Sequence, residues 1–380
     1  MRLALREAEK GLGRTSPNPA VGAVLVKDGR VVARGHHARA GTPHAEVVAL
    51  RAARERARGA DLYTTLEPCD HWGKTPPCSL AIIECGVRRV FVGSRDPNPM
   101  VNGRGLARLR RAGVEVVTDV LREACDALDA HWFRFIETGR PFVTLKAAVT
   151  LDGKIATASG HSRWVTGPAA RAEAHRLRDR VDAVLVGAGT ARADDPLLTT
   201  RLRGRRGHDP VRVVLDTNGT LPRSLRLFRV ESAAPTLIAT ASARRAWRPE
   251  VQILRCRARR GRVDLNDLLR RLGRRGITHL LVEGGAATHG AFLAAGLVDR
   301  LVLFIAPKIL GGGVDWLAGP GPRRMSDATL LQDVEVRRAG EDVVVTGTPV
   351  FRARGAGAGI VKAGTRRKLR NVLANLQQWD

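Results

Sequence analysis

Strand-length apolar runs alternate with helical stretches along most of this 380-residue chain. Segments such as 182–189 and 235–240 are nearly continuous apolar runs, as buried central strands tend to be. The alternation stops at 137–145, where Gly139 and Pro141 interrupt a helical pattern, and it begins again afterwards. The pattern predicts two successive α/β domains, which also suits a chain too long for one ordinary core.

This pattern divides the chain into three parts. Residues 1–140 are expected to form a first domain in the order β-β-α-β-α-β-α-β, and residues 141–351 a second α/β domain. Residues 352–380 begin with a stretch rich in glycine and alanine and end in a basic segment with apolar residues at helical spacing. A helix that packs on the body or on a second subunit is the ordinary interpretation of this extension, and a basic docking peptide is the alternative.

Lysine and arginine outnumber aspartate and glutamate by 64 to 37, so the formal net charge is +27. An arginine-rich composition, a phosphorylated small substrate or a nucleic-acid partner could each account for this excess. The basic residues are scattered through every segment, and only 4% of the chain is aromatic. Nucleic-acid binders instead gather basic residues with stacking aromatics, so we expect a small-molecule substrate and no nucleic acid. We also expect the protein to be a homo-oligomer.

The five cysteines are an odd number, which argues against a disulfide framework and favours metal binding or incidental use. No apolar run approaches the length of a membrane span, and the N-terminus lacks the apolar core of a signal peptide. We therefore expect a cytoplasmic protein that does not enter the membrane.

A histidine, a glutamate and two cysteines in the first domain have the types and order of a zinc deaminase site. His44 and Glu46 form a His-x-Glu pair before an apolar helical pattern, and Cys69 and Cys78 each follow a proline. Three protein ligands leave the fourth position of zinc to a water, whose pKa falls toward 7, and a nearby carboxylate can carry the proton. We assign His44, Cys69 and Cys78 as ligands and Glu46 as the proton shuttle; His71 could also ligate but is a weaker candidate.

The spacing of the two cysteines departs from the generic Cys-x-x-Cys of such sites, because eight residues separate Cys69 from Cys78. The intervening loop must fold outward if both sulfurs are to reach one metal. Its Gly73, Pro76 and Pro77 suit a loop of fixed shape.

Together with these residues, longer motifs closely resemble the family of bifunctional riboflavin-biosynthesis proteins, in which a pyrimidine deaminase is fused to a reductase. The first half carries "TSPNPAVGAVLVKDG", "PHAEVVAL" and "TLEPCDHWGKTPPC", and the second half "VTLKAAVTLDGKIATASGHSRWVTG", "VLVGAGTARADDPLLTTR" and "LLVEGGAATHGAFL". The resemblance runs from about residue 1 to about residue 350, and the long cysteine spacing is itself the form found in the family. It implies a cytidine-deaminase-like three-layer domain followed by a dihydrofolate-reductase-like domain.

The resemblance also implies two consecutive reactions and two cofactors. The first domain would use one Zn²⁺ to remove the 2-amino group of 2,5-diamino-6-ribosylamino-4(3H)-pyrimidinone 5′-phosphate. The second would use NADPH to reduce the ribosyl chain to a ribityl chain. The alternative from another class is a nucleic-acid-binding protein with a deaminase fold, which the charge and the basic C-terminal segment would motivate.

In the deaminase domain, three residues match substrate-side positions of the family. Asn18 corresponds to a position against the pyrimidine, and its amide can donate and accept at once; it could equally be a turn residue between two prolines. Lys74 could meet the phosphate as a point charge or remain solvated in its loop. Asp96 is the third such residue.

In the reductase domain a Rossmann fingerprint is absent, but glycine turns at 186–190 and 282–290 each follow a strand, where backbone amides can approach a diphosphate. By resemblance, the cofactor side includes Ala148, Trp164, Thr190, Asp194, Thr217, Gly285, Ala286, Ala287, Thr288, His289, Gly290 and Ala291. The substrate side includes Lys146, Ser162, Arg178, Leu198, Arg201 and Glu283. Arginines suit a phosphate because the guanidinium can form paired hydrogen bonds with it, and Asp152 is expected to shape a turn with Gly153.

Overall fold

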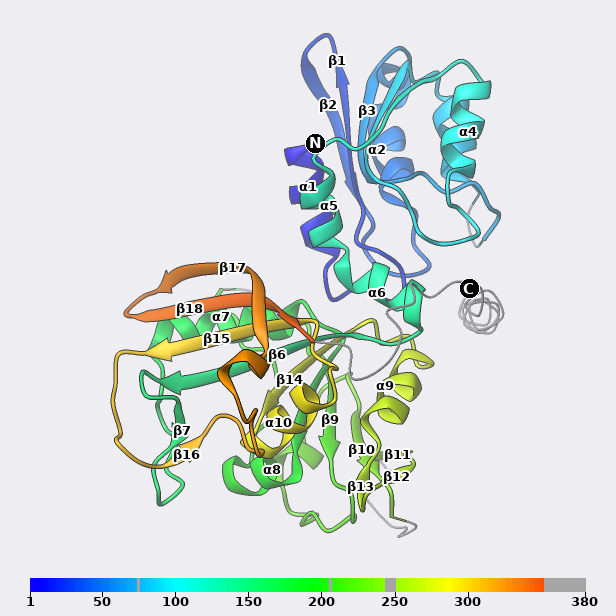
Figure 1. The fold of residues 1–380 in the computed structure, drawn as a ribbon. Coiled ribbons are helices and arrows are strands. Elements are labelled where there is room, and N and C mark those ends of the chain that lie inside the picture. The colour runs from blue at the N-terminus through cyan, green and yellow to red at the C-terminus, as the bar shows by residue number, and fades with distance from the viewer. Residues whose placement is uncertain (74–75, 205–206, 243–250, 352–380) are drawn as a thin grey trace. The chain divides into compact units, whose positions relative to one another are not determined.

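The computed structural model describes residues 1–73, 76–204, 207–242 and 251–351, so Lys74 and the extension 352–380 lie outside the described residues. Contacts divide the described chain into one compact unit that ends at Arg140 and another that begins at Pro141 (Figure 1). Each unit has its own sheet and its own hydrophobic core. Among the described residues, no helix combines the length and the hydropathy needed to span a membrane.

The described part of the first unit contains a five-stranded mixed sheet in the order β2-β1-β3-β4-β5. β1 is antiparallel to β2 and β3, whereas β3, β4 and β5 are parallel. The strands are β1 Gly22–Lys27, β2 Arg30–His36, β3 Asp61–Leu66, β4 Arg89–Ser94 and β5 Glu115–Val117. The helices are α1 Arg2–Ala8, α2 Ala45–Ala53, α3 Cys78–Glu84, α4 Arg104–Arg111, α5 Arg122–Leu128 and α6 Ala130–Thr138.

Local sequence explains how this unit starts. Asp28 and Gly29 both have positive φ, 51° and 73°, as a two-residue type I′ hairpin turn between β1 and β2 requires. α2 buries Ala45, Ala49 and Ala53 at a spacing of four residues, so one face of the helix packs on the sheet. This packing fixes where the N-terminus of α2 lies.

The described part of the second unit contains a nine-stranded sheet in the order β11-β10-β9-β8-β14-β6-β15-β18-β17. Its strands are parallel except β18 and β17, which form an antiparallel hairpin at one edge. The strands are β6 Phe142–Thr150, β8 Ala183–Gly187, β9 Val211–Leu215, β10 Thr236–Thr240, β11 Val251–Arg255, β14 His279–Gly284, β15 Arg300–Ala306, β17 Leu330–Ala339 and β18 Asp342–Val350. The short strands pair as β7 Lys154–Ala156 with β16 Val314–Asp315, and β12 Ala258–Arg259 with β13 Arg262–Val263. The helices are α7 Pro168–Asp179, α8 Ala188–Asp194, α9 Leu265–Gly273 and α10 Ala286–Ala294.

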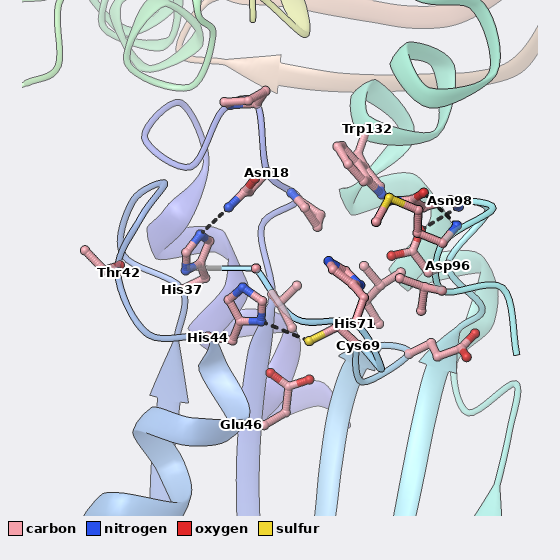
Figure 2. A pocket seen from close by; sticks show the side chains of 18 of the residues that line it. Asn18, His37, Thr42, His44, Glu46, Cys69, His71, Asp96, Asn98 and Trp132 are labelled. Carbon is pink, nitrogen blue, oxygen red and sulfur yellow. Dashed lines mark hydrogen bonds between the residues drawn. The ribbon is translucent and has the colours of Figure 1, made fainter. Parts of the chain in front are cut away.

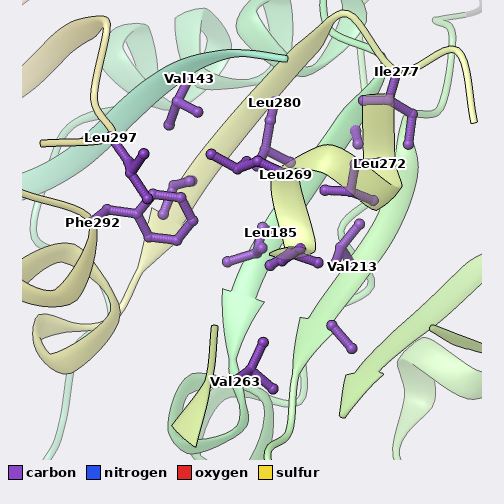
Figure 3. Packing of buried hydrophobic residues seen from close by; sticks show 14 of the residues in the cluster. Val143, Leu185, Val213, Val263, Leu269, Leu272, Ile277, Leu280, Phe292 and Leu297 are labelled. Atoms are coloured by element: carbon purple, nitrogen blue, oxygen red, sulfur yellow. The ribbon is translucent and has the colours of Figure 1, made fainter. Parts of the chain in front are cut away.

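Both faces of the central strands of this sheet are buried, which explains the continuous apolar runs in the sequence. Successive residues of a strand point to opposite faces, so Leu185 of β8 joins one core cluster and Val186 joins the other. Figure 3 shows the first of these clusters, where Leu269 and Leu272 of α9 pack over the strands.

The expected fold class, an α/β deaminase-like unit followed by an α/β reductase-like unit, is confirmed. The apolar helical pattern at His44 and Glu46 forms α2, which ends at Ala53 because Arg54 takes a positive φ, and a 3₁₀ turn follows over Arg54–Ala57. Among the elements that the sequence interpretation did not assign are α1, α5 and the β17–β18 hairpin. β17 is exposed at most positions, so it lacks the apolar pattern by which a buried strand is recognised.

Candidate active sites

The three predicted zinc ligands come together in the first unit. His44 is the N-cap of α2, Cys78 is the first residue of α3, and Cys69 lies in the loop that follows β3. The imidazole Nδ1 of His44 is 3.2 Å from the Sγ of Cys78 and 3.5 Å from the Sγ of Cys69. The three ligand atoms all lie within 4.8 Å of one another.

This arrangement fits a zinc ion. Tetrahedral zinc with ordinary Zn–S and Zn–N lengths places its nitrogen and sulfur ligands about 3.5 Å apart. A hydrogen bond from Cys78 lowers the pKa of the Cys69 thiol, aided by His44 and opposed by burial. The same hydrogen bond, with burial, raises the pKa of the Cys78 thiol. Thiolate is the form in which cysteine binds metal, so the donor set suits zinc in geometry, and Cys69 suits it in charge as well.

Glu46 lies in the first turn of α2, beside the three ligands and outside their group. Its side chain is buried, and its Oε2 accepts a hydrogen bond from Cys78 Sγ at 3.7 Å. Burial raises the pKa of Glu46 to about 7; the charge of Cys69 adds to this effect and His44 opposes it. A carboxyl group with a pKa near neutrality can both accept and release a proton at physiological pH.

A cavity of about 490 Å³ lies in front of His44, Glu46 and Cys69 (Figure 2). Asn18 lines it, and its amide Nδ2 is 3.2 Å from Nε2 of His37. The other ring nitrogen of His37, Nδ1, is 3.2 Å from the carbonyl oxygen of Pro43. Because a carbonyl can only accept, Nδ1 carries the proton and Nε2 accepts from Asn18. His37 therefore fixes the orientation of the Asn18 amide.

Asp96 also lines this cavity, as expected for a substrate-side residue. Its carboxylate accepts a hydrogen bond from the backbone N–H of Asn98 at 2.8 Å. Burial raises the pKa of Asp96 to about 7, against the lowering effect of the Asn98 N–H. His71 and Trp132 line the same cavity, whereas Lys74 lies outside the described residues.

Among the cavity residues that the sequence interpretation did not assign are His37, Asn98 and Trp132. His37 follows the last residue of β2, and Asn98 lies two residues after Asp96, so both were within reach of the motifs already considered. Trp132 belongs to α6, and no local pattern ties it to the zinc motif. The structure brings it to the site through tertiary packing.

In the second unit, Arg178 and Glu283 form a buried ion pair. Nε and Nη2 of Arg178 donate to the two carboxylate oxygens of Glu283 at 2.6 and 2.7 Å, although 105 positions separate the residues in the chain. Burial alone would raise the pKa of Glu283, but Arg178 and then Lys146 outweigh it and lower the pKa to about 2. Burial lowers the pKa of Lys146, with Glu283 opposing. The three predicted substrate-side residues thus form one charged cluster.

The segment that carries Leu198 and Arg201 is tied to α7. Nη1 of Arg178 donates to the carbonyl of Thr199 at 3.0 Å, and the backbone N–H of Arg201 donates to Nδ1 of His175 at 3.2 Å. Leu198 is buried and has a positive φ of 55°. Since Glu283 and Thr199 occupy the guanidinium of Arg178, we expect Arg201, which is more exposed, to be the stronger phosphate contact.

The two predicted glycine turns lie side by side, because their strands β8 and β14 are paired and parallel. A Cβ built on Gly285 would lie 2.9 Å from Oγ1 of Thr190, which shows how closely the turns approach. Gly290 faces the other way, since a Cβ there would lie 1.8 Å from the carbonyl of Ala318. His289 is buried, and its Nδ1 is 3.0 Å from the carbonyl of Trp316.

The remaining predicted reductase residues fall into separate neighbourhoods. Ser162 donates to Asp194 at 3.4 Å, and Trp164 is exposed with the Arg171 guanidinium 4.6 Å from its ring centre. Ala148 lies two residues after Lys146 on β6, on the same face of the strand. Thr217 lines a different cavity of about 440 Å³, whose other lining residues are Asn218, Thr220, Ala241, Ser242, Ala258 and Gly261.

Asp152 does more than shape a turn with Gly153. Its carboxylate accepts the hydroxyl of Thr150 at 2.6 Å and the backbone N–H groups of Leu310 and Gly311 at 3.2 and 2.8 Å. It therefore ties the loop after β6 to the loop after β15.

Comparison with known proteins places these two units in a defined class. Residues 1–94 match the cytidine and deoxycytidylate deaminase zinc-binding region, and residues 141–345 match the RibD C-terminal domain. A zinc-binding deaminase domain followed by a RibD C-terminal domain, which is the reductase domain, defines a two-domain deaminase/reductase.

The full-length relatives narrow this class to one family. The riboflavin biosynthesis protein RibD of Actinobacillus pleuropneumoniae is 44% identical over 91% of this chain and 93% of its own length. That of Escherichia coli is 41% identical over 90% of this chain and 96% of its own length. The chain belongs to the RibD family of riboflavin biosynthesis proteins, as its motifs predicted.

A solved structure agrees with this membership. The diaminohydroxyphosphoribosylaminopyrimidine deaminase/5-amino-6-(5-phosphoribosylamino)uracil reductase of Thermotoga maritima has 41% identity and a TM-score of 0.84, covering 92% of this chain and 97% of its own. The chain is accordingly a bifunctional enzyme of riboflavin biosynthesis that uses zinc and NADPH. Nothing supports the alternative of a nucleic-acid-binding protein with a deaminase fold.

Proposed function

We propose that the first domain removes the 2-amino group of 2,5-diamino-6-ribosylamino-4(3H)-pyrimidinone 5′-phosphate by hydrolysis and releases it as ammonia. The second domain then reduces the ribosyl chain of the product with NADPH to give 5-amino-6-(5-phospho-D-ribitylamino)uracil. The observation that carries the proposal is the His44–Cys69–Cys78 cluster, with Glu46 beside it and Asn18 and Asp96 on the same cavity.

In the deaminase, His44, Cys69 and Cys78 hold the zinc, which when bound supplies a nucleophilic water at neutral pH. Glu46 would accept a proton from that water and deliver it to the departing amine, a role that suits a buried carboxyl with a pKa of about 7. Asn18, held by His37, presents its amide to the pyrimidine edge. Lys74 is assigned to the substrate phosphate.

In the reductase, the substrate is assigned to Lys146, Ser162, Arg178, Leu198, Arg201 and Glu283. NADPH is assigned to the paired turns around Thr190 and Gly285–Ala291, together with Ala148, Trp164, Asp194 and Thr217. Parallel strands β8 and β14 end at the same edge of the sheet, where α/β sheets bind ligands. The charged cluster of Lys146, Arg178 and Glu283 suits the sugar phosphate side.

The direct test is turnover of the diaminopyrimidinone phosphate by the purified full chain, with and without NADPH. We expect ammonia release in both cases and NADPH oxidation only after deamination. Absence of ammonia release from zinc-loaded protein would refute the proposed substrate.

Zinc removal separates the two activities. Dialysis against a chelator is expected to abolish ammonia release, because the protein groups alone cannot generate the nucleophile at neutral pH. Reduction of pre-deaminated substrate should continue at its normal rate. Zinc added back should restore deamination, and a chelated protein that still deaminates at full rate would exclude a metal mechanism.

Replacing Arg201 by alanine is expected to raise the KM for the phosphorylated substrate about tenfold or more, because one charge-assisted hydrogen bond to phosphate is lost. The KM for NADPH should stay within about twofold of the wild-type value. Arg203, which is also exposed in this segment, provides the matched control as Arg203→Ala. A fall in NADPH affinity alone would mean that the two sides of the site are reversed.

We further propose that the enzyme works in the cytoplasm as a homo-oligomer and without a nucleic-acid partner. Cysteine ligands must stay reduced to bind zinc, and a reducing compartment such as the cytoplasm keeps thiols from forming disulfides. Light scattering of the purified chain tests the oligomer, and a salt-titrated RNA-binding assay tests the absence of a nucleic-acid partner.

A further inference from the structure

The eight residues between Cys69 and Cys78 raise a physical question that the three ligands do not answer. A long insertion costs entropy when its ends are brought together, and metal ligands need their spacing held to within a few tenths of an ångström. Something outside the ligand set must hold the two cysteine segments in place.

Asp70, the residue after Cys69, makes contacts that can do this. Its Oδ1 accepts the hydroxyl of Ser79 at 2.6 Å, and Ser79 is the residue after Cys78. The backbone N–H of Ser79 also donates to the carbonyl of Cys69 at 3.2 Å. Ser79 therefore joins the two cysteine segments through two hydrogen bonds, one to Asp70 and one to Cys69.

Helix α4 holds the same segment from outside. Nε of Arg108 donates to Oδ1 of Asp70, forming an ion pair in which the carboxylate side chain is only 9% exposed. On the other side of Cys69, Gly105 packs so closely on Pro68 that a Cβ would lie 1.9 Å from the Pro68 carbonyl. Both neighbours of Cys69 are thus fixed against one helix.

We propose that Asp70, with Ser79 and Arg108, is a positioning residue for the zinc site: it holds Cys69 and Cys78 at ligand distance despite the insertion between them. The inference rests on the proposed role of His44, Cys69 and Cys78 as zinc ligands. Asp70 itself makes no contact with the metal or the substrate in this role. Groups outside a ligand set typically change metal affinity about 10- to 100-fold when they are removed.

The test is zinc affinity of the full chain, measured by competition with a chromophoric chelator and so independent of turnover. Asp70→Ala is expected to weaken zinc binding about tenfold. Asp70→Asn should lose less zinc affinity than Asp70→Ala, because the amide oxygen of asparagine can still accept the hydrogen bond from the Ser79 hydroxyl. Arg108→Gln should weaken binding, whereas Arg110→Gln, an exposed arginine on the same helix, should not.

Cobalt(II) substitution distinguishes positioning from general destabilisation. Asp70→Ala should weaken and shift the visible cobalt–thiolate bands, while the thermal unfolding of the metal-free protein changes little. Ser79→Ala should reproduce the loss, and it carries the test if Asp70→Ala does not fold. If these variants keep the zinc affinity and the cobalt spectra of the wild type, the positioning role of Asp70 is overturned and the proposed function is not. If the wild-type chain itself binds no zinc, the proposed function is overturned as well.

Discussion

Glu46→Gln is expected to lower deaminase turnover about 10²- to 10⁴-fold while leaving zinc bound. Glutamine has nearly the shape of glutamate but cannot accept a proton from the attacking water or pass it to the amine. The three candidate ligands His44, Cys69 and Cys78 are retained, since Glu46 is not one of them, so zinc should stay bound. Ammonia release and zinc content, measured on the same sample, check both halves of this expectation.

Two controls complete this experiment. Reduction of pre-deaminated substrate should be normal in Glu46→Gln, because the reductase residues lie in the other unit. Glu55→Gln, an exposed glutamate just after the same helix, should retain full deaminase activity. A deaminase rate in Glu46→Gln equal to the wild-type rate would remove Glu46 from its assigned role.

Arg178→Ala is expected to destabilise the second unit by about 3–5 kcal/mol, because it leaves the carboxylate of Glu283 buried without its partner. The side chains of this pair are only 14% and 7% exposed, so water cannot replace the lost contacts. Calorimetry of the full chain should show the loss in the unfolding of the second unit. Substrate reduction should fall as well, since both residues belong to the proposed substrate side.

The pH dependence of this loss has a definite sign. The pKa of Glu283 is lowered from its usual 4.5 to about 2, so the unfolded chain binds more protons than the folded chain between these values. The stabilisation is therefore fully present above about pH 4.5 and is lost as the pH falls toward 2. In calorimetry of the wild-type chain, the contribution of ionised Glu283 to the unfolding free energy should stay constant from pH 5 to 8 and shrink below pH 4.

A matched surface pair and a double substitution sharpen the result. Arg337 of β17 pairs with Glu173 of α7 at 2.6 Å, but its side chain is 49% exposed, so Arg337→Ala should cost less than about 1 kcal/mol. Arg178→Met combined with Glu283→Gln should recover part of the lost stability, because the carboxylate of Glu283 is no longer buried without Arg178, although Lys146 then loses its neighbouring negative charge. If Arg178→Ala is no more destabilising than Arg337→Ala, the buried pair does not stabilise this unit.

In the deaminase site, some residues could be predicted from a short sequence motif and others could not. His44 and Glu46 are two residues apart at a helix start, so a short motif was enough to predict both the ligand and its neighbour. His37 and Trp132 had no such motif. Their place on the cavity depends on where β2 ends and on how α6 packs.

The reductase site shows the opposite case. Arg178 and Glu283 were assigned to the substrate side by resemblance, but their pairing across 105 positions could not be read from either segment. The same holds for the paired turns at Thr190 and Gly285, which meet because β8 and β14 are neighbours in the sheet. Neighbouring strands need not be consecutive in the chain, and a single sequence carries no record of that order.

The sequence by itself predicted the two α/β units, the candidate zinc ligands and the family, because periodicity and short motifs are local properties of the chain. Only the tertiary structure decided which distant groups meet: Asp70 with Arg108, Arg178 with Glu283, and Asn18 with His37. Each of these contacts joins segments that are brought together by the packing of helices on a sheet. Burial there makes the contacts strong, since hydrogen bonds and charges that are shielded from water must satisfy one another.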